Sequence, residues 1–134
     1  MLDASVAVAW ELNESTSAKA LALRELAELG VHELLAPDIF PVECAHALTR
    51  AERRGLLSTG QAGIILAHIL YIDMQFSPSI SLIARATEIS SRMKLGVYDC
   101  LYVVLAMDEQ SPLVTSDQKL IIKFPDIAIN IMAL

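Results

Sequence analysis

The chain has 134 residues, of which 54% are hydrophobic and 19% are charged. This composition excludes a disordered protein and predicts one domain with a proper core over residues 1–134. The 10 Lys and Arg residues against 16 Asp and Glu residues give a net charge of −6, which excludes nucleic-acid binding through a broadly basic surface.

Short β-like apolar runs alternate with longer helical runs along the chain, a pattern that predicts an α/β fold with a central, mainly parallel sheet flanked by helices. Strands are expected at residues 1–2, 33–36, 71–76, 113–115 and 128–131. Helices are expected at residues 6–12, 15–29, 41–54, 61–70, 80–94, 98–107 and 118–122. Gly30 and Gly55 suit helix ends, and Ser58–Gln61 is typical of a capping box.

The sequence also bears on the location of the protein. No apolar run reaches the roughly 20 residues of a membrane-spanning helix, and Met1-Leu2-Asp3 leaves no room for a signal peptide. Cys44 and Cys100 do not make a disulfide framework and read as buried small residues. We therefore expect a cytoplasmic protein without a membrane anchor.

Four acidic residues lie inside or beside apolar stretches: Asp3, Glu43, Asp99 and Asp117. A carboxylate without a partner is expensive to remove from water, and no basic residue immediately adjoins any of the four. Asp3 and Asp117 follow expected strands. Glu43 and Asp99 fall in the first turns of expected helices, so the fold can gather all four acids at one edge of the sheet. Oxygen ligands alone point to Mg²⁺ or Mn²⁺ rather than zinc.

Each acid also has a structural explanation when it is taken singly. Acidic residues favour the first turn of a helix, which accounts for Glu43 and Asp99, and Asp117 suits an ordinary N-cap. Only the combination, with every acid at the edge of the sheet where strands end and helices begin, favours a functional site.

The chain resembles the PIN domain family, in particular the VapC-like toxins of bacterial toxin–antitoxin pairs. The resemblance rests on four motifs in order: residues 2–7 (LDASVA), 37–50 (PDIFPVECAHALTR), 97–102 (VYDCLY) and 113–120 (LVTSDQKL). Each motif alone is weak, but four in this order at these intervals are specific, and the similarity covers essentially the whole chain.

The resemblance implies a metal-dependent ribonuclease that is inhibited by a cognate antitoxin protein and forms homodimers. The family's acidic quartet would be Asp3, Glu43, Asp99 and Asp117. Asp3 and Asp99 would be the metal ligands, with Mg²⁺ or Mn²⁺ as cofactor. Ser5 and Thr115 occupy places where the family often has a supporting hydroxyl.

Several other residues carry weaker expectations. Arg50 lies two helical turns after Glu43 on roughly the same face, so we expect it to contact a substrate phosphate, with a structural ion pair as the alternative. His46 reads as a helix-packing residue. Tyr98, Tyr102 and Trp10 read as core residues rather than a surface on which bases stack.

Two further functions stay open: a catalytically silent module that binds a protein partner, and a PIN-like nuclease outside a toxin–antitoxin pair. Two other classes are excluded at the first acidic motif. A phosphotransfer receiver domain needs adjacent acids where Ala4 follows Asp3, and a dehalogenase-like phosphatase needs Asp where Ser5 stands.

Overall fold

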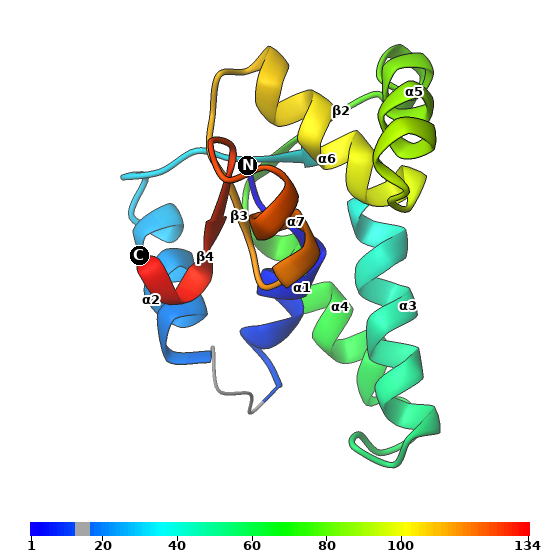
Figure 1. The fold of residues 1–134 in the computed structure, drawn as a ribbon. Helices are drawn as coiled ribbons and strands as arrows, with labels where there is room; N and C mark the ends of the chain where they lie inside the picture. The colour runs from blue at the N-terminus through cyan, green and yellow to red at the C-terminus, as the bar shows by residue number, and fades with distance from the viewer. Residues whose placement is uncertain (13–16) are drawn as a thin grey trace.

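The computed structural model describes residues 1–12 and 17–134 (Figure 1). Its α-helices are α1 (Ala4–Ala9), α2 (Ser17–Glu28), α3 (Phe40–Arg53), α4 (Gln61–Tyr71), α5 (Ile83–Met93), α6 (Val97–Asp108) and α7 (Gln118–Lys123). Its strands are β1 (Leu34–Pro37), β2 (Met74–Ser77), β3 (Leu113–Thr115) and β4 (Ala128–Asn130). Short 3₁₀ helices cover Ser79–Ser81 and Ile131–Ala133.

The sheet is parallel and depends on the first three residues of the chain. β1 pairs with β2, and β3 pairs with β4, both in parallel register. Between the two pairs, the N–H of Leu2 donates to the carbonyl of Leu35 (2.9 Å) and the N–H of Asp3 donates to the carbonyl of Val114 (3.1 Å). The order is therefore β2, β1, residues 1–3, β3 and β4, which confirms the predicted α/β fold with a mainly parallel sheet.

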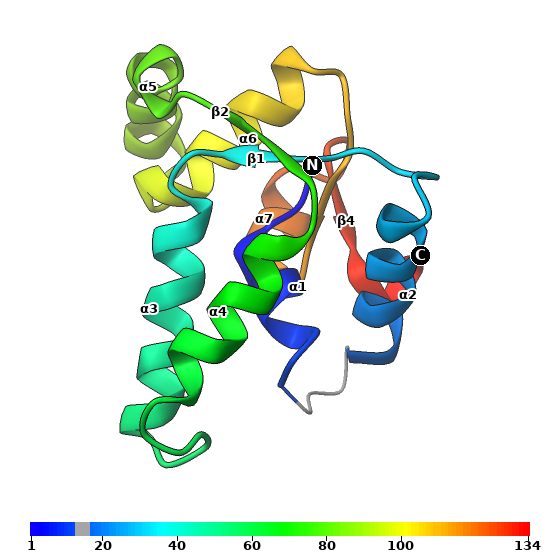
Figure 2. The same cartoon turned by 180° about the vertical axis from the view of Figure 1, so that it is seen from behind.

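Helices flank this sheet on several sides (Figure 1, Figure 2). α3 and α4 form an antiparallel pair at one side of the molecule, and α2 lies at the opposite side beside the C-terminus. α6 contains a long buried run, because every residue from 100 to 106 is buried. This burial explains why its sequence is apolar nearly all round.

The structure corrects several predicted boundaries. The predicted strand 71–76 starts too early, because Tyr71 is the last residue of α4 and β2 begins at Met74; periodicity alone does not separate the end of an apolar helix from a following strand. The predicted strand 33–36 is shifted by one residue, and Pro37 belongs to β1. Residues 15 and 16 of the predicted helix 15–29 lie outside the described residues.

The capping box predicted at Ser58–Gln61 forms only in part. The Gln61 side chain accepts from the N–H of Ser58 (2.6 Å), but the N-cap of α4 is Gly60. The Glu52 carboxylate accepts from the N–H groups of Gly60 (2.9 Å) and Ala62 (2.7 Å). A side chain from α3 thus satisfies the N–H groups of the N-cap residue and of Ala62 in the first turn of α4, which a local sequence window does not reveal.

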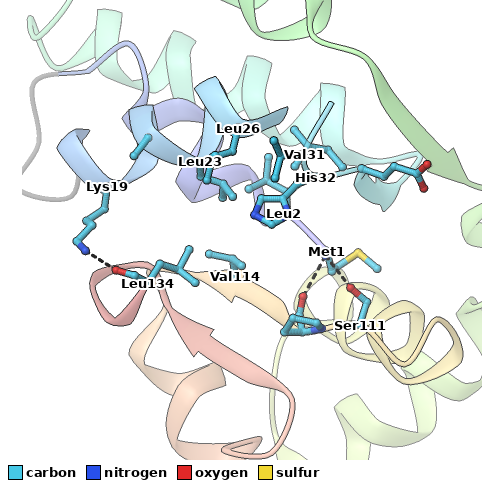
Figure 3. Close-up of a pocket in the computed structure, with 14 residues that line it drawn as sticks. Met1, Leu2, Lys19, Leu23, Leu26, Val31, His32, Ser111, Val114 and Leu134 are labelled. Carbon is cyan, nitrogen blue, oxygen red and sulfur yellow. Dashed lines mark hydrogen bonds between the residues drawn. The ribbon is translucent and has the colours of Figure 1, made fainter. Parts of the chain in front are cut away.

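A cavity of about 670 Å³ lies where α2 meets residues 1–2 and the start of β3 (Figure 3). Its wall is mainly apolar and includes Leu23, Leu26 and Val114. The ammonium group of Met1 donates to Ser111 Oγ (3.2 Å) and to the carbonyl of Pro112 (3.0 Å). None of the four acids lines this cavity, so it is separate from the site described below.

In the described parts of the chain, we find no helix with the length and apolar character that crossing a membrane requires.

Candidate active site

Asp3 is held by two hydroxyl groups. It is the N-cap of α1, and Ser5 Oγ donates to Asp3 Oδ2 at 2.8 Å. The Thr115 hydroxyl, on a fully buried side chain at the end of β3, donates to the same oxygen. One carboxylate oxygen of Asp3 is thereby fixed by side chains that come from both ends of the sequence.

The same hydroxyls hold the loop that carries Asp117. The N–H of Asp117 donates to Thr115 Oγ1 (3.0 Å), and the N–H of Ser116 donates to Ser5 Oγ (3.3 Å). Asp117 caps α7 by accepting from the N–H of Lys119 at 2.7 Å. Asp117 is therefore an N-cap, as its structural explanation predicted, and it also lies beside Asp3.

Glu43 lies in the first turn of α3 and is half-buried. Its pKa is raised to about 7, mainly by burial and to a smaller extent by the negative charges of Asp3 and Asp99. The hydroxyl of Tyr102 donates to Glu43 Oε2 at 2.5 Å and acts in the opposite direction, because it favours the charged carboxylate.

Asp99 lies in the first turn of α6 and is also half-buried. Its pKa is raised to about 6: burial is the main cause, repulsion from Asp117 and Asp3 contributes, and the positive charge of Lys119 opposes the rise. Gly96 makes room for this side chain: a Cβ atom at residue 96 would lie 3.2 Å from Asp99 Oδ2.

The fold thus brings all four predicted acids into one region. Glu43 is repelled by Asp3 and Asp99, and Asp99 is repelled by Asp3 and Asp117, so each carboxylate lies within electrostatic range of another. They approach from four separate segments, at the carboxyl ends of residues 1–3 and β3 and at the first turns of α3 and α6. This is the arrangement that the sequence predicted for the carboxyl edge of a parallel sheet.

The chemical type of the donor atoms fits a hard divalent cation, because all of them are oxygens. The acids supply only carboxylate oxygens, and the nearby Ser116 Oγ is a buried oxygen for which the described residues offer no hydrogen-bond partner. Within residues 1–12 and 17–134, however, no three His, Cys, Asp or Glu side chains converge closely enough to hold one ion. The carboxylates therefore do not form a complete set of ligands for one ion, so an ion bound there would keep several of its water molecules.

Two residues near the acids were missed by sequence reasoning. Tyr102 was expected in the core; it is buried, but its hydroxyl reaches Glu43. The signal was its position three residues after Asp99, which puts both on one helical face. Lys119 was not considered, although it follows Asp117 by two residues and its charge reaches Asp99.

Other expectations fare unevenly. Cys44, Cys100 and Trp10 are buried, as predicted. His46 is exposed on α3, so its predicted packing role is wrong, and Tyr98 is 59% exposed rather than in the core.

Arg50 is exposed in the last turn of α3. The ion pairs found among the described residues do not include Arg50, so the alternative of a structural ion pair is not supported. Its contact with substrate stays a prediction.

Comparison with known proteins identifies the family. The model of the PIN domain matches residues 1–127. The chain belongs to the PIN domain family. It is also 35% identical over 104 residues to Ribonuclease VapC1 of Mycobacterium tuberculosis, in strain CDC 1551 / Oshkosh and in strain ATCC 25618 / H37Rv. The match covers 77% of this chain and 75% of that relative, which confirms the resemblance to VapC-like PIN domains.

The raised pKa of Glu43 predicts a pH-dependent stability in the absence of metal. Its pKa of about 7 lies above the ordinary value of 4.5, so the folded protein binds this proton more tightly than the unfolded chain does. The stabilisation is complete below the unfolded pKa and is lost as the pH rises through the folded pKa. In EDTA, the free energy of unfolding of the wild type relative to Glu43→Gln should therefore fall between pH 4.5 and about 7.

Urea denaturation at several pH values measures this difference. Glu88→Gln, on an exposed position of α5, controls for the loss of one surface carboxylate. A Glu43→Gln profile that runs parallel to the Glu88→Gln profile would contradict the raised pKa of Glu43.

Proposed function

We propose that this chain is a Mg²⁺-dependent endoribonuclease that hydrolyses RNA phosphodiester bonds at the acidic quartet (Asp3, Glu43, Asp99 and Asp117), with Mn²⁺ as a possible substitute. The observation that carries the proposal is that the fold gathers these four carboxylates from distant segments, at the N-caps of α1 and α7 and in the first turns of α3 and α6. Similarity to a relative named as a ribonuclease supports the reaction class. Conformity to the PIN domain model over residues 1–127 supports the same reading.

The residues divide into two pairs. Asp3 and Asp99 would hold the cation directly, and Glu43 and Asp117 would orient water molecules or hold a second ion. The hydroxyls of Ser5 and Thr115 fix Oδ2 of Asp3, and the N–H of Ser5 donates to Oδ1 (3.4 Å), so the orientation of the whole carboxylate is set. A bound divalent cation supplies an acidified water molecule and positive charge next to the phosphate. The same charge would offset the burial and the repulsion that raise the pKa of Glu43 and Asp99.

We further propose that the protein is the toxin of a toxin–antitoxin pair, with RNA as substrate and a cognate antitoxin protein as inhibitor. A homodimer in the cytoplasm is part of this proposal. Large apolar side chains exposed on α4, namely Ile64, Leu70 and Tyr71, support a surface for a protein partner. A short open reading frame next to the gene would support the pairing with an antitoxin.

Asp99→Asn tests the catalytic role of the quartet. Asparagine keeps the shape of the side chain but removes the negative charge that holds a cation. RNA cleavage with Mg²⁺, measured in single-turnover assays, should fall at least about 100-fold, in line with the loss of a metal-dependent step. Asp3→Asn should have the same effect.

Asp108→Asn is the matched control, because Asp108 lies at the other end of α6 in an exposed ion pair with Arg85. This variant should cleave RNA like the wild type. Full activity in Asp99→Asn with a normal thermal melt would refute the assignment, and wild-type protein that cleaves no RNA with Mg²⁺ or Mn²⁺ would favour a silent interaction module.

Arg50→Ala tests the predicted contact with the RNA backbone. Removing one phosphate contact should weaken RNA binding and reduce the slope of log K against log salt by about 0.7 for a single strand. Arg92→Ala, an exposed arginine in the last turn of α5, is the charge-matched control. Binding would be measured with an inactive Asp99→Asn background, and equal slopes for the two arginine variants would argue against the contact.

A further inference from the structure

We infer that Tyr102 is a positioning residue for Glu43: its hydroxyl fixes one carboxylate oxygen and leaves the other available to the site. The inference rests on the proposed function, because it assigns Tyr102 a part in the same reaction. It adds a member to the site that is not acidic and that comes from the middle of the buried helix α6.

The Tyr102 side chain is buried, and its hydroxyl donates to Glu43. The side chain is 2% exposed, and its hydroxyl crosses from α6 to α3 to reach Glu43 Oε2 at 2.5 Å. Among the described residues, this is the one hydrogen bond that the Glu43 side chain accepts. Because the tyrosine ring is packed in the core, water cannot replace it without a change in that packing.

Glu43 needs such a partner because its neighbours push it away. Asp3 and Asp99 repel its carboxylate, and a glutamate side chain has several rotatable bonds by which it can turn toward solvent. A buried hydroxyl donor holds the carboxylate in place against this repulsion. The phenol does so without a positive charge, so the negative charge that attracts a cation is preserved, whereas Lys or Arg at this point would neutralise it.

The arrangement repeats what is seen at Asp3. There Ser5 and Thr115 direct neutral hydroxyls at one carboxylate oxygen, Oδ2. At Glu43 the hydroxyl comes from Tyr102 and is likewise directed at one oxygen, Oε2. Outer groups that orient ligands in this way typically change metal affinity or activity by 10- to 100-fold when they are removed.

Tyr102→Phe removes the hydroxyl and keeps the ring. We expect kcat for RNA cleavage to fall about 10-fold with KM for RNA unchanged, because Tyr102 does not touch substrate. In a Glu43→Gln background, Tyr102→Phe should cause no further loss, because the carboxylate that it positions is already gone. Tyr98→Phe is the matched control, since Tyr98 is exposed on the same helix, and it should leave kcat unchanged.

Wild-type kcat in Tyr102→Phe would overturn the inference, as would an equal further loss in the Glu43→Gln background. The second outcome would mean that Tyr102 acts on something other than Glu43. A result against the proposed function can be distinguished from a result against this inference, because in that case the wild type itself would cleave no RNA.

A measurement independent of activity and metal uses the three tyrosines of the chain. In protein labelled with ¹³C at tyrosine Cζ, Glu43→Ala should shift the Tyr102 signal and leave the Tyr98 signal in place. This comparison retains Tyr102, so it applies even if Tyr102→Phe fails to melt cooperatively. An unchanged Tyr102 signal would overturn the inference.

Discussion

Repulsion among half-buried carboxylates is the constraint on which the rest of this structure depends. Glu43 and Asp99 are partly removed from water, and each faces the charges of two other acids. Burial of a charge without compensation opposes folding, yet the chain places these residues at the ends of its most regular elements. Among the described residues, none of the four acids forms an ion pair with Arg or Lys, so the cluster can still attract a positive charge from outside.

The residues around the acids reduce the free-energy cost of burying these charges but do not remove it. Neutral hydroxyls from Ser5, Thr115 and Tyr102 each donate to a carboxylate oxygen, and the first turns of α3 and α6 favour negative charge. Lys119 contributes one nearby positive charge, which lowers the pKa of Asp99. Hydroxyl donors therefore fix single carboxylate oxygens of Asp3 and Glu43 and leave the negative charge of the cluster available to a hydrated cation.

Sequence reasoning predicted most of the elements because their signals are local. The parallel sheet, the apolar helix α6 and the helix ends at Gly30 and Gly55 follow from periodicity and from residues with special backbone freedom. The four acids were found because each stands out against an apolar stretch. Contacts across the fold could not be predicted from the sequence. The capping of α4 by Glu52, the hydrogen bond from Tyr102 to Glu43 and the exposure of His46 all depend on how the helices pack. The boundary between α4 and β2 was misplaced for a different reason, because the apolar run is continuous there.

The central claim is that the four acids share a divalent cation, and the most direct test is to locate one. Crystals grown with Mn²⁺ and measured at the manganese absorption edge would give an anomalous peak wherever the ion binds. The account predicts a peak in direct contact with oxygens of Asp3 and Asp99, with Glu43 and Asp117 around it. A saturated crystal with no peak among these four side chains, or with manganese bound only elsewhere, would contradict it.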